Sequence, residues 1–114
     1  MQLGREHLER VLEKLEREGA RSYVSLQRAG LVYRTDEPSE QHHLVAVTIS
    51  LFRRLLQLHE QIPGLTVPLL LSVVAQEIVG ALSRREQRRD HDDPMGLFLV
   101  GTLLRHGIPQ DLGV

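Results

Sequence analysis

The fold of this chain is decided by residues 66–85, which read TVPLLLSVVAQEIVGALSRR. If this stretch is helical, its first two turns carry no charge, and apolar side chains point in every direction around the axis. A helix that is apolar on all sides is buried on all sides. In a chain of 114 residues, such a helix occupies the centre of a bundle, an interface between subunits, or both.

The composition is that of an ordinary globular protein. Hydrophobic residues make up 41% of the chain and charged residues 25%, which argues against disorder. The formal net charge of −1 gives no overall basic field for nucleic acid. The absence of cysteine excludes a disulfide framework, thiolate zinc sites and thiol catalysis.

The apolar runs are short. The most apolar one, residues 65–75, falls below the roughly 20 residues of a membrane span, and the N-terminus has no secretory pattern. A cysteine-free chain also suits the cytoplasm. We therefore predict a cytoplasmic protein that does not interact with membranes.

Four helices follow from the apolar periodicity and the end signals. They are expected at residues 2–18, 39–61, 66–85 and 94–106, while residues 20–38 leave a short helix, strands and loop all open. The predicted fold class is all-α. The chain forms a small four-helix bundle-like single domain over residues 1–114, with a peripheral first helix and a flexible tail at residues 110–114.

Three glycines fall inside the predicted helices, at Gly80, Gly96 and Gly101. Glycine in mid-helix costs about 1 kcal/mol relative to alanine. We therefore expect these positions to allow close approach of another helix.

The polar residues contain no established catalytic or metal-binding motif. Adjacent histidines on a helix diverge by about 100°, so His42 and His43 do not easily share one ion. His91, Asp92 and Asp93 are interpreted as solvated residues and a helix cap. A pair formed by Glu77 and His59 would be the one route to acid–base chemistry. We predict no enzymatic activity, no metal and no cofactor.

Residues 39–85 have the outline of a helix-turn-helix, with IPGLT as the turn. The recognition helix would then begin with Val, Pro and three leucines, which cannot hydrogen-bond to base edges. The arginines at positions 84, 85, 88 and 89 are followed by three aspartates, which cancel much of their field. A DNA-binding regulator is therefore the alternative interpretation, and direct nucleic-acid binding is not expected.

Surplus apolar surface favours protein–protein interaction, because helical apolar faces beyond the needs of one core form interfaces. On the second helix, aromatic, aliphatic and arginine side chains mix as they do at interface hot spots. The predicted partner-binding residues are Leu51, Phe52, Arg53, Leu55, Leu56 and His59. The predicted homodimer interface lies on the third and fourth helices, at Leu69, Leu70, Val73, Val74, Gly101 and Leu104.

Two segments resemble a known family. VTISLFRRLLQLHEQIP, residues 47–63, resembles the helix of TraM-type quorum-sensing antiactivators, with its Thr-Ile start, Arg-Arg-Leu centre and Pro stop. GTLLRHGIP, residues 101–109, resembles their closing segment. The size and the Arg- and Leu-rich helical composition are similar to the QslA antiactivators. The charged first helix and the tyrosine-containing segment after it depart from the TraM pattern.

The resemblance implies a function. Members of this class are small, dimeric, helical and without catalytic activity. The implied partner is a LuxR-type transcriptional activator, whose dimerisation or DNA binding the antiactivator blocks. A partner-binding helical face would then compete for the activator's own apolar dimer surface.

Overall fold

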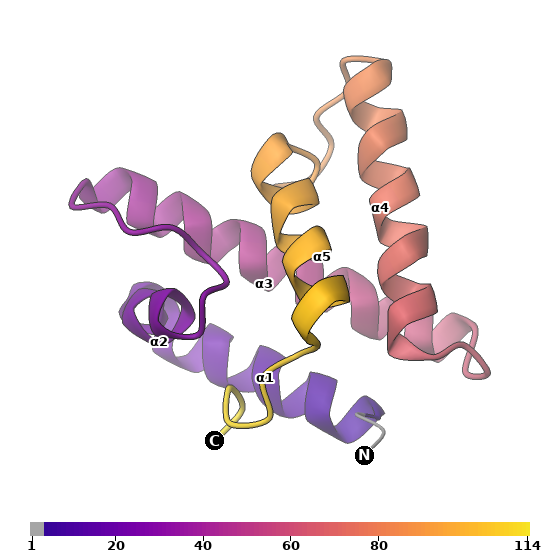
Figure 1. The fold of residues 1–114 in the computed structure, drawn as a ribbon, viewed down its shortest axis with the longest axis horizontal. Coiled ribbons are helices and arrows are strands. Elements are labelled where there is room, and N and C mark those ends of the chain that lie inside the picture. The colour runs from indigo at the N-terminus through magenta and orange to yellow at the C-terminus, as the bar shows by residue number, and fades with distance from the viewer. Residues whose placement is uncertain (1–3) are drawn as a thin grey trace.

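The computed structural model describes residues 4–114, and this range contains helices and connections without a strand (Figure 1). Four long helices carry the fold, and a 3-10 turn at Gly19–Ser22 with a short helix α2 follows the first of them. The all-α prediction is confirmed, although residues 2 and 3 of the predicted first helix lie outside the described range. The helices are α1 at Arg5–Glu18, α2 at Tyr23–Arg28, α3 at Pro38–Gln61, α4 at Val67–Ser83 and α5 at Pro94–His106.

Helix α3 is the central element of the molecule. It packs against α1, α2, α4 and α5, and it crosses the whole width of the molecule behind α5 in Figure 1. Its buried residues surround much of its axis, because neighbours cover it on several sides. They are Leu44, Val45, Val47, Thr48, Leu51, Phe52, Leu55 and Leu58. The β-branched run at its start therefore stays helical because tertiary packing outweighs intrinsic propensity.

Helix α4 is not buried on all sides within one copy of the chain, so residues 66–85 are not the centre of the bundle, and the other expectation, a subunit interface, stays a prediction. Leu70, Leu71, Val74, Ile78 and Ala81 form its buried face. The opposite side is open, with Leu69 51% and Val79 48% exposed. The helix lies at one side of the molecule, where it packs on α3 and α5 (Figure 1). Its apolar surface therefore exceeds what one copy of the chain buries.

Helix α1 lies at the edge of the bundle, as its narrow apolar stripe predicts. Leu8, Val11 and Leu15 are fully buried against α3, and the charged face points outward. Two ion pairs join its outer face to α3, from Arg5 to Glu60 and from Arg53 to Glu16, each at 2.9 Å. Exposed pairs of this kind contribute little stability, so the apolar stripe holds the helix.

The segment between α1 and α3 takes one of the arrangements that the sequence left open. After α2, an extended stretch returns along α3 (Figure 1). The Tyr23 hydroxyl fixes this stretch, since it donates to the Tyr33 carbonyl (2.9 Å) and accepts from the Thr35 amide (2.7 Å). The buried phenol thus helps to order a segment without regular structure, together with Glu40 and Gln41 of α3, which also hydrogen-bond to it.

The C-terminal tail is part of the core, which corrects the prediction of a flexible end. Leu112 is 5% exposed and belongs to the main apolar cluster. Gly113 packs on Arg10 and Val11 of α1, and the Lys14 ammonium donates to the Val114 carbonyl. The tail therefore ties the end of the chain to its first helix.

Among the described residues, none of the helices combines the length and the apolar character that a membrane span requires.

Candidate functional site

The predicted partner-binding residues on α3 mostly lie inside the molecule. Leu51, Phe52 and Leu55 have no exposed surface, so these three predictions are wrong: the residues form the core of this chain. Leu56 is half-buried and packs against the same core. Of the six residues, Arg53 is exposed and pairs with Glu16, and His59 is half-buried.

The predicted dimer residues divide into two groups. Leu70 and Val74 are fully buried within the chain, so they cannot belong to an interface in this conformation. Leu69 and Leu104 are exposed, at 51% and 44%, and Val73 and Gly101 are partly accessible. The prediction thus names four residues that a second molecule can reach.

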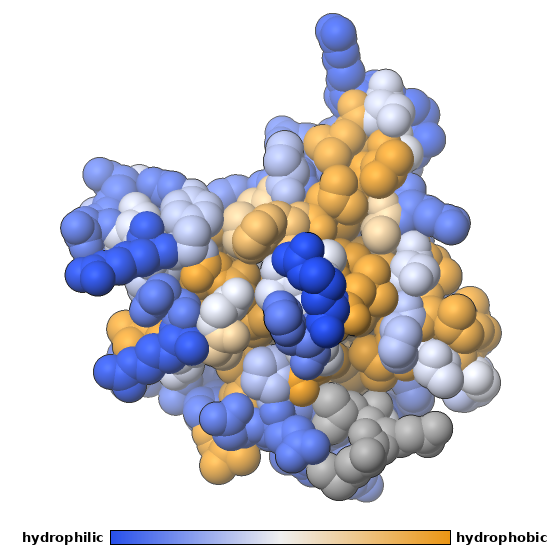
Figure 2. Space-filling view, viewed as in Figure 1, coloured by the Kyte–Doolittle hydropathy of each residue, from blue (hydrophilic) through white to orange (hydrophobic). Residues whose placement is uncertain are grey.

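The exposed apolar residues concentrate on α4 and α5. Figure 2 shows hydrophobic side chains along α4 and along the side of α5 that faces it, whereas polar side chains cover the region of α2 and the start of α3. Four of the eight large hydrophobic residues exposed in the described range lie on these two helices. We call them the α4–α5 surface: Leu69, Val79, Phe98 and Leu104.

A cavity of about 580 Å³ opens at the lower end of this surface. Its floor is apolar, with Leu71 and Leu103 from the two helices, and Leu104 stands at its edge. His59 and Thr66 supply polar groups from α3 and the turn before α4. Nothing in the lining is acidic, and its residues continue the α4–α5 surface toward the α3–α4 turn.

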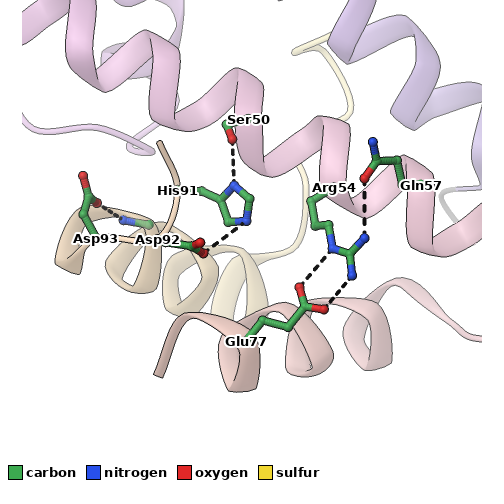
Figure 3. Close-up of polar contacts among 8 residues, drawn as sticks. Ser50, Arg54, Gln57, Glu77, His91, Asp92 and Asp93 are labelled. Atoms are coloured by element: carbon green, nitrogen blue, oxygen red, sulfur yellow. Dashed lines mark hydrogen bonds and ion pairs between the residues drawn. The ribbon is translucent and has the colours of Figure 1, made fainter. Parts of the chain in front are cut away.

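A polar cluster lies on the other side of α4, where the α4–α5 connection crosses α3. The imidazole of His91 is 1% exposed, and its Nδ1 lies 2.7 Å from Ser50 Oγ (Figure 3). Its Nε2 has no hydrogen-bond partner; the carboxylate oxygen Oδ1 of Asp92 lies 3.5 Å away. Burial lowers the pKa of His91 below its usual 6.5, and the charge of Asp92 opposes that shift.

An ion pair extends this cluster to α4. The guanidinium of Arg54 donates twice to Glu77, from Nε at 3.0 Å and from Nη2 at 2.6 Å (Figure 3). The hydrogen bond from Arg54 lowers the pKa of Glu77, so the carboxylate stays ionised. Glu77 is therefore paired with Arg54. It does not form the acid–histidine pair with His59 that the sequence left open.

The start of α5 is built on the same face of α3. Asp93 caps α5 by accepting from the Gly96 amide at 2.9 Å, and its second carboxylate oxygen lies 2.9 Å from His43 Nε2. Gly96 is required here, because a Cβ would lie 1.8 Å from the His91 carbonyl oxygen. The predicted cap is confirmed, but His91, Asp92 and Asp93 are buried rather than solvated.

The predicted close approach of another helix is wrong at all three glycines. Gly96 has a close neighbour, although it is the backbone of the preceding connection and not another helix. An added Cβ at Gly101 would have nothing within 4 Å, and at Gly80 it would meet only the flexible side chain of Arg84.

Ser50, His91 and Asp92 are the residue types of a hydrolytic triad, but the arrangement does not support that chemistry. The serine contacts Nδ1 and the aspartate faces Nε2 at a distance too long for a hydrogen bond. The imidazole is also closed off from solvent, so no substrate reaches it. Within residues 4–114, no cluster of three or more histidine and acidic side chains is arranged to hold a metal ion.

Sequence reasoning missed the polar stripe of α3. His43, Ser50 and Arg54 stand seven and four residues apart, which places them on one side of a helix. The spacing was readable from the sequence. Their partners were not, because His91, Asp93 and Glu77 lie on elements whose approach depends on the tertiary fold.

Comparison of the chain with protein-family models, curated proteins and solved structures finds no match. The resemblance to TraM-type antiactivators therefore remains a prediction from the two short segments that carry it.

Proposed function

We propose that this protein is a cytoplasmic regulator that binds a LuxR-type transcriptional activator and blocks its dimerisation or DNA binding. The observation that carries the proposal is the α4–α5 surface, where large apolar side chains stay uncovered in a single copy of the chain. Large exposed apolar patches mark protein-interaction sites, and we infer that these four side chains contribute to one. The binding site thus moves from α3, where the sequence suggested it, to α4 and α5.

The chemistry of the α4–α5 surface suits an apolar partner. Phe98 and Leu104 offer an aromatic and an aliphatic anchor on α5, and Arg105 follows them in the exposed last turn. Interface hot spots combine such anchors with arginine. An activator that dimerises through its own apolar helices presents a complementary surface. The same patch on the activator can then form either its own dimer or the complex with this protein.

The alternative, a helix-turn-helix DNA-binding regulator, has less support. The exposed residues at the start of α4 are Thr66, Pro68 and Leu69, which offer DNA no cationic contact. Several arginines are engaged by acids: Arg5, Arg17, Arg53, Arg54, Arg84 and Arg88. Phosphate contacts need positive charge, and these six ion pairs reduce the share of the thirteen arginines that is available for them.

The same surface accounts for a homodimer. When the protein is free, a second copy can cover Leu69 and Leu104, and the activator then competes with it by mass action. The free protein is therefore expected to self-associate, and the variants that weaken capture of the activator are expected to shift it toward monomer.

The test is capture of purified LuxR-type activators from the source organism by the immobilised protein. Phe98→Asp and Leu104→Asp place a charge on the α4–α5 surface and are expected to weaken the dissociation constant at least about tenfold. The helical circular dichroism signal should persist, because both side chains are half exposed. Sedimentation velocity of the same variants measures self-association.

The matched control is Val24→Asp, which places the same charge on an equally exposed apolar residue of α2. Capture by this variant should equal that of the unmodified protein. Undiminished capture by both α5 variants would remove the α4–α5 surface from the proposal. Sequence-selective DNA binding that survives about 0.2 M salt would favour the helix-turn-helix alternative instead.

A further inference from the structure

The connection between α4 and α5 is fastened to α3 at two points. His91 meets Ser50, and Asp93 meets His43, and the two α3 residues stand two turns apart on one face of the helix. Between these points the His91 carbonyl presses on Gly96 in the first turn of α5. The backbone of His91 is therefore in close contact with the start of α5.

The imidazole of His91 is held in its neutral form. It is 1% exposed, and Ser50 Oγ lies 2.7 Å from Nδ1. If Ser50 donates its proton to Nδ1, the ring proton sits on Nε2 and points toward Asp92, which suits a carboxylate at 3.5 Å. A buried imidazolium would turn Nδ1 into a donor toward that hydroxyl and would lose its hydration.

We propose that His91 and Ser50 form a pH-sensitive clasp, in which protonation of His91 releases residues 84–92 from α3 and loosens the contact of the His91 carbonyl with Gly96 at the start of α5. The released imidazolium gains hydration that the folded site denies it. The clasp is independent of the partner proposed above, because it concerns the attachment of one segment of this chain to another.

The charged groups around His91 come from every element packed against it. Arg54 faces it from α3, Glu77 from α4, and Arg89 and Asp92 from the connection itself. The two arginines disfavour a third positive charge, whereas the two carboxylates favour it. Desolvation has the largest effect, so the pKa of His91 lies below its ordinary value of 6.5.

The direction of the pH effect follows from that shift. The open connection takes up a proton near pH 6.5, before the closed one does, so closure weakens as the pH falls from 6.5 through the lower pKa of the closed state. The open population rises about tenfold for each pKa unit that separates the two states. Glu77 contributes to pH dependence below its ordinary 4.5, because its pKa is also lowered.

The experiment is hydrogen exchange of the full chain at several pH values between 7.5 and 5, corrected for the intrinsic pH dependence of exchange. Amides of residues 84–97 are expected to lose protection as the pH falls, while those of α1 keep theirs. In His91→Gln, the same amides should show no such loss over this range. His42→Gln is the matched control, because His42 is an exposed histidine on α3, the helix that carries Ser50. This variant should behave like the unmodified chain.

A second variant covers the case in which His91→Gln fails to fold. Ser50→Ala removes the hydrogen bond that favours neutral His91, so the amides of residues 84–97 should be less protected already at pH 7.5. Their further loss of protection should be smaller and should end at a higher pH, and Ser50→Thr should restore the behaviour of the unmodified chain. The clasp would be overturned if the amides of residues 84–97 lost as much protection in His91→Gln as in the unmodified chain when the pH falls. An unchanged midpoint in Ser50→Ala would overturn the role of Ser50 in it.

Discussion

Gly96 and Gly101 lie on the same helix, α5, yet they meet opposite surroundings. At Gly96 a Cβ would collide with the His91 carbonyl, which is backbone and cannot swing away. At Gly101 a Cβ would enter open space. The first glycine is therefore required by close packing, whereas the second only weakens the helix.

This contrast predicts opposite effects of one substitution. Gly96→Ala should destabilise the fold by about 1–3 kcal/mol through overpacking. Gly101→Ala should stabilise it by up to about 1 kcal/mol, because alanine is the better helix former. Thermal unfolding followed by circular dichroism measures both, and Gly101→Ala serves as the control for the change from glycine to alanine. A lower melting temperature for Gly101→Ala would show that another chain covers this position.

His91, Asp92 and Asp93 show why single residues resist prediction from sequence. A polar run after a helix is usually solvated, and nothing local distinguishes this one. Burial of the run depends on Ser50 and His43, which lie more than 40 residues earlier in the chain. The cap by Asp93 was predictable because it uses only the residues beside it.

At the scale of the element, the more apolar of the helices α3 and α4 is not the more buried one. Helix α4 is the more apolar, yet α3 is the more enclosed, because four other helices contact α3. The apolar periodicity predicted the existence and approximate bounds of the four long helices. It could not predict which of them lies at the centre, since that depends on how the connections place their neighbours.

A substitution at Phe52 tests whether α3 is enclosed by its neighbours. Phe52→Asp would bury an unpaired carboxylate in the core, where the native side chain has no exposed surface. We expect this substitution to lower the free energy of unfolding by more than about 4 kcal/mol, which is a large part of the stability of a small domain. We expect loss of the helical circular dichroism signal at 37 °C.

The control for this substitution is His42→Asp, which places the same group on an exposed residue of α3. This variant should stay folded. A folded Phe52→Asp would mean that α3 can present this face to solvent, as the sequence alone suggested.

At the scale of the whole molecule, the tail joins elements that are otherwise connected through α3. Between their Cα atoms, no residue of α4 or α5 comes within 8 Å of α1 or α2 over the range that the structure describes. Residues 108–114 cross this gap: the Pro109 carbonyl lies 3.2 Å from His7 Nε2, and Leu112 enters the core. The start of α1 and the C-terminus both lie at the lower side of the molecule in Figure 1.

The tail therefore contributes to global stability. Leu112→Ala should lower the free energy of unfolding by about 2 kcal/mol, because it removes buried apolar side-chain surface. Urea denaturation measures the loss, and Gln110→Ala, at an exposed position of the same segment, should have no effect within about 0.5 kcal/mol. Equal stability of the two variants would mean that the tail is not held in place.

The separation of the two helix pairs across α3 also affects how the protein can change. Sites more than about 7–10 Å apart without shared partners contribute additively to stability. Substitutions on the outward sides of α4 and α5 are thus insulated from the packing of α1 and α2. The exposed faces of α4 and α5 can therefore accept substitutions at little cost to the fold, whereas their buried faces belong to the same apolar core as α1.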